Sequence, residues 1–219
     1  MKMKLLTALA VLAMAGVASA NLLTNPGFET GDTNGWSAAL SGGTGTASTT
    51  YANSGTYSLM LDSTGAGGWS SPNLLQSVYG AAGKEYGLSG YILMPSAAPI
   101  TDGSFGLFKI EFWDASLDPI DPASVSVGAA AGAPYYGAES DVFVNSASAT
   151  DTWLFSETVA VAPVGTVYVR FIALNVNEGV APSALYFDDI VAVPEPATMG
   201  LVALFGAGLL VYRRFRFTV

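Results

Sequence analysis

Phe108-Lys109-Ile110-Glu111-Phe112-Trp113 alternates apolar side chains with charged or amphipathic ones. Successive side chains of an extended strand point to opposite faces, so the three apolar members at every second position would enter a core. The other three would share the opposite face, which is either a concave ligand surface or plain solvent. The alternation predicts a β-strand that is buried on one face.

The same two-residue period recurs on both sides of this stretch. Its inward apolar sets are Tyr57, Leu59 and Leu61; Tyr86, Leu88 and Ile92; and Val167, Val169 and Phe171. Clusters of glycine, proline, asparagine and aspartate separate these runs, and we find no convincing helical period between residues 21 and 192. Many short strands with turns between them predict an all-β fold, an antiparallel β-sandwich of the jelly-roll type.

Residues 1–20 have the features of a secretory signal peptide. Lys2 and Lys4 precede an apolar stretch over residues 5–17, and Ala18-Ser19-Ala20 offers the small side chains that a signal peptidase requires. We expect cleavage after Ala20, which would leave Asn21 as the mature N-terminus. The alternative, an uncleaved N-terminal membrane anchor, is disfavoured because the apolar stretch is short and ends in small residues.

Residues 193–219 contain three features in a fixed order: Val193-Pro194-Glu195-Pro196, an apolar run over residues 197–212, and a basic cluster of Arg213, Arg214 and Arg216. The prolines favour a stiff extended spacer, the apolar run predicts a transmembrane helix, and the arginines favour the cytoplasmic side. At about 1.5 Å per residue the run covers about 24 Å of a hydrocarbon core of roughly 30 Å. The helix would therefore span only with snorkelling arginines or in a thin membrane.

This order of motif, helix and basic cluster resembles the PEP-CTERM sorting signal of Gram-negative bacteria. The resemblance implies that an exosortase-type sorting enzyme recognises and processes residues 193–219. It also implies a precursor anchored in the inner membrane with its body facing the periplasm, followed by transfer to the cell surface or the extracellular matrix. The processing site, and whether the product stays anchored or is secreted, are left open.

The body, residues 21–192, has the length of one domain able to bury its own core. It carries only Lys84, Lys109 and Arg170 against sixteen acidic residues, a net charge of −13. This charge excludes nucleic-acid binding through phosphates and favours the attraction of divalent cations. The chain has no cysteine and no histidine, which excludes Ser-His-Asp and Cys-His catalysis and histidine-ligated zinc.

Short landmarks across the body resemble the carbohydrate-binding jelly rolls of families 4 and 9, which are galactose-binding-like sandwiches. They are Asn21-Leu22-Leu23-Thr24-Asn25-Pro26-Gly27-Phe28-Glu29, Gly35-Trp36, Gly55-Thr56-Tyr57-Ser58-Leu59, Gly83-Lys84-Glu85-Tyr86, Trp153 and Tyr186-Phe187-Asp188-Asp189-Ile190. The resemblance implies a structural Ca²⁺ held by Glu29 and Asp188, with Asp189 as the substitute. Carboxylates that meet at the terminal strands would repel unless a cation joined them, and calcium favours such oxygen ligands. The alternative is that these acids cap turns or face water.

Sugar binding requires aromatic faces with polar groups beside them. The candidates are Trp113, Trp69, Tyr168, Arg170 and Tyr91, and Tyr135-Tyr136 could add a further contact. Each aromatic has an alternative role in packing, and we expect Trp36 and Trp153 to be structural.

The sequence therefore predicts an exported surface or matrix protein whose non-catalytic body associates with extracellular polysaccharide. The alternative is a purely structural protein of the envelope or biofilm matrix without a sugar site. A glycosidase would need two carboxylates held across the glycosidic bond. The acids Glu111, Asp114, Glu139, Asp141 and Glu157 could supply such a pair, but nothing in their spacing selects two of them, and we expect no enzyme.

Overall fold

A computed structural model of the chain describes residues 20–65, 69–101, 103–120, 137–140, 144–179 and 181–194. Asn21–Pro194 form one compact unit. The predicted signal peptide, the predicted helix over residues 197–212, Glu195, Pro196 and the three C-terminal arginines lie outside the described residues. In the part of the chain that is described, no helix is long and apolar enough to cross a membrane.

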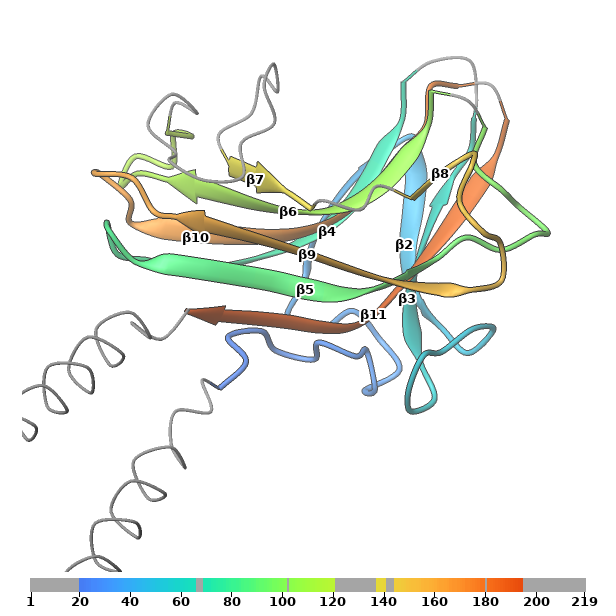
Figure 1. The fold of residues 1–219 in the computed structure, drawn as a ribbon, viewed down its shortest axis with the longest axis horizontal. Coiled ribbons are helices and arrows are strands. Elements are labelled where there is room, and N and C mark those ends of the chain that lie inside the picture. Colours follow the sequence, from blue (N-terminus) through green and yellow to red (C-terminus); the bar gives the residue numbers. More distant parts are fainter. Residues whose placement is uncertain are drawn as a thin grey trace, which may run out of the picture. The chain divides into compact units, whose positions relative to one another are not determined.

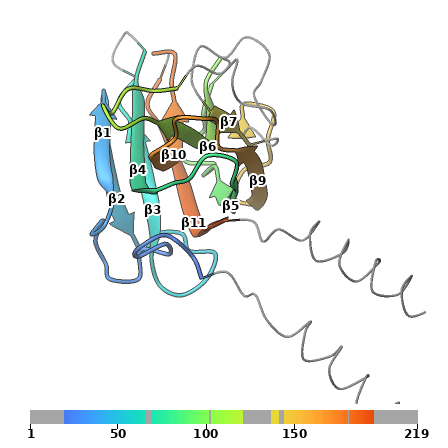
Figure 2. The same ribbon diagram turned by 90° about the vertical axis from the view of Figure 1, so that its left-hand side faces the viewer.

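The unit consists of two antiparallel sheets that form a sandwich, as predicted, and its described residues contain no helix (Figures 1 and 2). Sheet A has the order β1 (Ser37–Ser41), β4 (Ser71–Tyr79), β10 (Tyr168–Val176), β6 (Phe105–Trp113) and β7 (Gly137–Glu139), with β8 (Val144–Asn145) also beside β6. Sheet B has the order β2 (Gly43–Ser48), β3 (Ser58–Ser63), β11 (Ser183–Pro194), β5 (Glu85–Leu93) and β9 (Trp153–Val161). All strand pairs are antiparallel.

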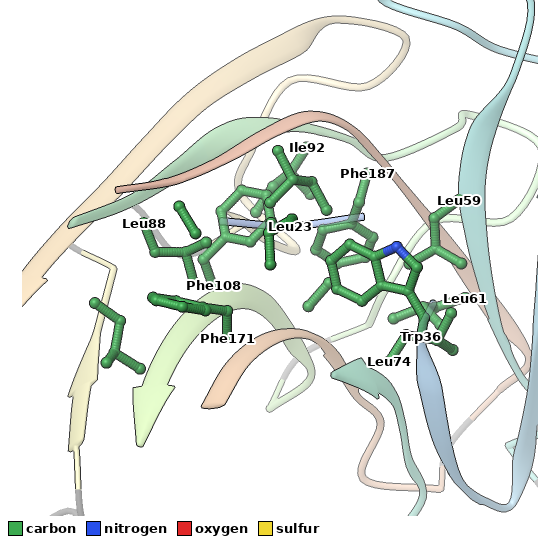
Figure 3. Close-up of a cluster of buried hydrophobic side chains, with 14 of the residues drawn as sticks. Leu23, Trp36, Leu59, Leu61, Leu74, Leu88, Ile92, Phe108, Phe171 and Phe187 are labelled. Atoms are coloured by element: carbon green, nitrogen blue, oxygen red, sulfur yellow. The ribbon is translucent and has the colours of Figure 1, made fainter. Parts of the chain in front are cut away.

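The core between the sheets contains the side chains that the two-residue period predicts. Phe108, Ile110 and Phe112 of β6 are fully buried. Phe108 meets Phe187 of β11 edge to face, with ring centroids 5.5 Å apart, and Figure 3 shows both among the buried residues of the two sheets. Each such side chain contributes about 1.5–3 kcal/mol on burial, so the alternation predicts both the strand and its inward face correctly.

The opposite face of β6 is only partly open. Leu107 and Lys109 point away from the core and are nevertheless buried. Lys109 forms an ion pair with Glu111, with Nζ 2.8 Å from Oε1, and lies opposite Glu139 of β7. The expectation that this face is open to solvent is therefore wrong at Lys109, because the side chain is buried beside Glu111 and Glu139.

The two tryptophans that we expected to be structural have different environments. Trp36 is 9% exposed, stacks on Phe28 with ring centroids 5.3 Å apart, and donates its indole N–H to the carbonyl oxygen of Asn25 at 3.1 Å. This confirms its expected place in the core. Trp153 packs instead beside a small cluster that includes Leu93 and Tyr186, separate from the main core.

A β-bulge interrupts the alternation of β11 and decides where its two aspartates point. The pairing with β5 shifts between Asp188 and Val191, and Asp189 has a left-handed backbone with φ of 49°. As a result Phe187 and Ile190, three positions apart, are both buried in the core. A bulge adds one residue to a strand and redirects the side chains around it.

Candidate functional site

Three aromatic side chains form one row across three neighbouring strands of sheet A. Tyr168 of β10 lies opposite Tyr79 of β4 on one side and opposite Trp113 of β6 on the other. Directly opposed residues share a face, and Val169, beside Tyr168, is in the core, so the row lies on the outer face. The Tyr79 and Tyr168 rings are 5.2 Å apart between centroids and inclined at 32°, and Tyr79 is 82% exposed. We call Tyr79, Tyr168 and Trp113 the aromatic row.

Arg170 lies in the next position of β10 on the same face and covers one side of the row. Its guanidinium Cζ is 3.4 Å from the centroid of the Trp113 ring, a cation–π contact. Its Nε is buried and has no hydrogen-bond partner. One face of Trp113 is thus occupied by Arg170.

Glu111 fixes the orientation of the Trp113 indole through a hydrogen bond. The indole Nε1 of Trp113 donates to Glu111 Oε2 at 3.1 Å, while Glu111 Oε1 accepts from Lys109 at 2.8 Å. Both carboxylate oxygens of Glu111 are therefore engaged by side chains of its own strand.

The other two predicted sugar contacts lie elsewhere. Trp69 precedes β4 at the end opposite Tyr79, about 30 Å along the strand at roughly 3.3 Å per residue, and it is 67% exposed. Tyr91 is on β5 of sheet B, where it meets Phe155 of β9 edge to face at 5.4 Å. The structure thus brings Trp113, Tyr168 and Arg170 together and leaves Trp69 and Tyr91 apart from them.

The acids predicted to bind calcium meet at one loop, residues 53–57. Asp188 is fully buried, and its Oδ2 accepts from the backbone N–H of Asn53 at 2.7 Å and of Ser54 at 3.2 Å. Glu29 accepts from the backbone N–H groups of Thr56 and Tyr57 with its carboxylate. Asp189 points to the side chains of Asn53 and Ser54, not to Glu29.

Glu29 and Asp188 lie close to each other as well as to the loop. A methyl group placed on Gly27 would be 3.6 Å from Asp188 Oδ1 and 3.7 Å from Glu29 Cγ. Burial raises the pKa of Asp188, and the charge of Asp189 raises it further, against the lowering effect of the three backbone hydrogen bonds. A cation beside Asp188 would relieve this burial cost.

The donor set limits how a metal could bind there. Among the described residues, no group of three or more histidine, cysteine, aspartate or glutamate side chains could hold a metal ion. A cation at Glu29 and Asp188 would need main-chain carbonyl oxygens for its remaining ligands, which calcium accepts. The residues therefore fit calcium and fit poorly a metal that requires several side-chain ligands.

The candidate catalytic acids do not form an evident pair. Asp114 accepts from the backbone N–H groups of Ser116 and Asp118 and so caps a turn, Glu157 is on sheet B, and Asp141 lies outside the described residues. Glu111 and Glu139 are diagonal neighbours on β6 and β7, with Lys109 opposite Glu139. An open hollow of about 500 Å³ lies at the other end of β6, lined by Gly103, Ser104, Phe105, Asn145, Ser146 and Ala147, and contains none of these acids.

The C-terminal motif begins inside the sandwich. Val193 and Pro194 are the last residues of β11 and lie opposite Gly87 and Tyr86 of β5. The family model described as the PEP-CTERM protein-sorting motif matches residues 192–216. This chain carries a PEP-CTERM motif. The motif marks an exported protein that is processed at a membrane in bacteria of the Gram-negative type, and its first residues are sheet residues rather than a free spacer.

Solved structures with similar folds include carbohydrate-binding modules and parts of enzymes. The CBM22-1 xylan-binding domain from Paenibacillus barcinonensis Xyn10C is 19% identical, with a TM-score of 0.53, over 84% of this chain and 99% of that domain. The enzymatically active domain of Bacteriophage CBA120 tailspike protein 4 is 15% identical, with a TM-score of 0.57, over 80% of this chain and 21% of that one. An arabinose-bound α-L-arabinofuranosidase is 13% identical, with a TM-score of 0.56, over 80% and 26%.

These similarities establish the sandwich fold. At such low sequence identity they do not indicate the function of this chain. The expected resemblance to carbohydrate-binding modules holds, and the module described above belongs to family 22. No curated protein matches the sequence.

Sequence reasoning missed Tyr79 and the loop over residues 53–57. Tyr79 shares the outer face of β4 with Ser77 and Leu75. This face mixes polar and apolar side chains, so the sequence shows no clear two-residue hydrophobic period there. The amide donors of the loop are backbone groups, and only the glycine at position 55, with φ of 63°, signals a tight turn there.

Proposed function

We propose that this chain is an exported, non-catalytic protein whose sandwich binds extracellular polysaccharide along the aromatic row. The observation that carries the proposal is the alignment of Tyr79, Tyr168 and Trp113 across three adjacent strands. Such a row spans about 10 Å, since strands lie roughly 4.8 Å apart. Exposed aromatic faces beside polar groups are what stacking on sugar rings requires.

The tail defines the route of the protein. A signal peptidase removes residues 1–20, the helix over residues 197–212 holds the precursor in the inner membrane, and an exosortase-type enzyme processes the PEP-CTERM motif. The product then resides at the cell surface or in the extracellular matrix, where a polysaccharide ligand is abundant. The motif at residues 192–216 supports this route.

Calcium is proposed as a structural ion at Glu29 and Asp188. Both carboxylates hold the loop over residues 53–57 through its backbone N–H groups, and Asp188 is buried without a cationic partner among the described residues. An ion bound there would neutralise the two carboxylates and fix the loop against β11. Asp189 serves as a hydrogen-bond acceptor for the loop side chains.

One observation favours a second candidate, a structural matrix protein without a sugar site. Arg170 covers one face of Trp113, which is also how a purely structural cation–π contact would look. Under this alternative the row contributes only packing.

Affinity electrophoresis of the full chain in detergent, through gels that contain neutral or acidic polysaccharides, separates the two. The proposal expects retardation by at least one polysaccharide and its loss in Tyr168→Ala, with an unchanged circular dichroism spectrum. Phe155→Ala, an exposed aromatic on sheet B, is the matched control and should keep the retardation. A folded protein that no gel retards would establish the structural alternative.

A further inference from the structure

Basic side chains are scarce in the body, and two of the three share one face. Lys109 on β6 and Arg170 on β10 lie on the outer face of sheet A, where Lys109 is two residues from Glu111, the residue opposite Arg170. Lys84 is exposed in the turn before β5. Glu111 and Glu139 lie on the same face as Lys109 and Arg170, so these four charged side chains sum to zero in a body that carries sixteen acids.

Among the described residues, no carboxylate forms an ion pair with Arg170. Its buried Nε lacks an acceptor. An arginine side chain stays protonated in a protein. Burying half of its charged guanidinium without an anion therefore costs folding free energy. Stacking on Trp113 compensates only in part, because a cation–π contact leaves the in-plane N–H donors unused.

The nearest carboxylate in register does not form an ion pair with Arg170. Glu111 lies directly opposite Arg170, but its Oε1 is held by Lys109 and its Oε2 by the Trp113 indole. The guanidinium carbon lies over the Trp113 ring, and because Nε is buried, an outside acceptor would have to bind the terminal Nη groups.

We propose that the aromatic row recognises anionic sugars, with the carboxylate of a uronate unit bound by Arg170 while its ring stacks on Tyr168 or Tyr79. This inference rests on the proposed function and names its substrate class. Arginine suits the task because its planar fork donates two parallel hydrogen bonds to a carboxylate. The general repulsion between a polyuronate and the acidic body is short-ranged at physiological salt, where the screening length is about 8 Å.

The test compares polygalacturonate with its fully methyl-esterified form, which has the same backbone without the charge. Binding of the full chain in detergent is measured by affinity electrophoresis at about 0.15 M salt. We expect at least tenfold tighter binding to the acid than to the ester, and loss of this preference in Arg170→Gln. Lys84→Gln is the matched control, since it removes an equal charge away from the row.

Each possible result either supports or overturns the inference. Equal binding of acid and ester, or an acid preference that survives in Arg170→Gln, overturns the inference while the proposed function stands. Absence of binding to both forms and to neutral polysaccharides overturns both. If Arg170→Gln does not fold, Arg170→Lys replaces it and should retain the charge but lose most of the preference, because an ammonium cannot form the bidentate contact.

The side chain of Asn21 forms hydrogen bonds with the end of β11, next to the PEP-CTERM motif. We call these hydrogen bonds the Asn21 clasp. Its Nδ2 donates to the carbonyl oxygen of Ile190 at 2.8 Å, and its Oδ1 accepts from the N–H of Ala192 at 3.0 Å. The backbone N–H of Leu22 adds a bond to the carbonyl oxygen of Ala192 at 2.8 Å. The residue that signal peptidase would make the mature N-terminus is therefore hydrogen-bonded to β11 beside the start of the motif.

We infer that this clasp slows sorting, because the sorting enzyme must first separate Val193 and Pro194 from β5. An extended peptide can be bound by pairing with the edge of a partner's sheet, and here Val193 and Pro194 of the Val-Pro-Glu-Pro motif are already paired with β5. Loosening the last strand should thus expose the motif more often.

Pulse-chase analysis in a host with the sorting enzyme tests the inference, together with hydrogen exchange at the Ala192 amide. Asn21→Ala should speed exchange and raise the processing rate about five- to tenfold, which corresponds to one net hydrogen bond. Val191→Ala, exposed on the same strand, should change neither, and N-terminal sequencing confirms cleavage after Ala20. Unchanged exchange, or faster exchange without faster processing, overturns the inference.

Discussion

The guanidinium carbon of Arg170 lies over the Trp113 ring, 3.4 Å from the ring centroid. The contact joins β10 to β6 on the outer face of sheet A and leaves Trp113 with at most one face for a ligand. Tyr79 and Tyr168, which lie in the same row, offer further ring faces on which a sugar could stack.

Trp113→Ala should weaken polysaccharide binding about tenfold, because it removes one member of the row and the support of Arg170. Isothermal titration of the full chain with the retained polysaccharide measures the change. Trp69→Ala is the control, since Trp69 lies at the far end of β4. A loss in Trp69→Ala as large as that in Trp113→Ala would contradict the row as the binding surface.

Glu111→Gln should lower the free energy of unfolding by about 3 kcal/mol, because it breaks a nearly buried ion pair. The side chains of Lys109 and Glu111 are only 7% and 14% exposed. Urea denaturation followed by tryptophan fluorescence measures the change. Lys109→Met/Glu111→Leu should recover part of the loss, and a single variant as stable as the wild type would show that the pair contributes nothing.

The stability of the protein should depend on pH through the protonation of Asp188. Because its pKa is raised in the folded protein, the protonated form stabilises the fold. This contribution is complete below the ordinary value near 4 and is lost as the pH rises through the raised pKa. With a chelator present, the melting temperature should therefore carry a component that falls as the pH rises above about 4.

Calcium should remove that component, because a bound cation favours the carboxylate form. The rise in melting temperature caused by calcium should then grow with pH and disappear in Asp188→Asn, but persist in Asp118→Asn, an exposed acid far from Glu29. A calcium effect that is absent, or that is equal at pH 4.5 and pH 7.5, would contradict the site.

Gly55→Ala should destabilise the protein more than Gly83→Ala. Both glycines have positive φ, 63° and 75°, and a side chain there costs about 1–2 kcal/mol. A methyl group on Gly55 would also collide with the Glu29 carboxylate, whereas one on Gly83 meets nothing within 4 Å. Thermal melts of the two variants measure the difference, and equal costs would show that Glu29 yields without loss.

The alternation of apolar residues predicted the inward faces of the strands, since burial repeats every second residue in a flat strand. It could not predict the row formed by Tyr79, Tyr168 and Trp113, because register between distant strands is set by turns and packing and not by the pattern of one strand. Nor could it predict the bulge at Asp189, which directs Asp188 toward the loop. Glu29 and Asp188 accept from the same loop, and the backbone donors of that loop leave almost no sequence signal.

The most direct test of polysaccharide binding on sheet A compares two double variants with the wild type on the same polysaccharide gels. Tyr79→Ala/Tyr168→Ala removes aromatics from the outer face of sheet A, and Tyr91→Ala/Phe155→Ala removes an equal number from the outer face of sheet B. We predict that the first variant loses retardation while remaining folded and that the second keeps it. Retention of binding in the first variant, or loss only in the second, would contradict the assignment of the binding face.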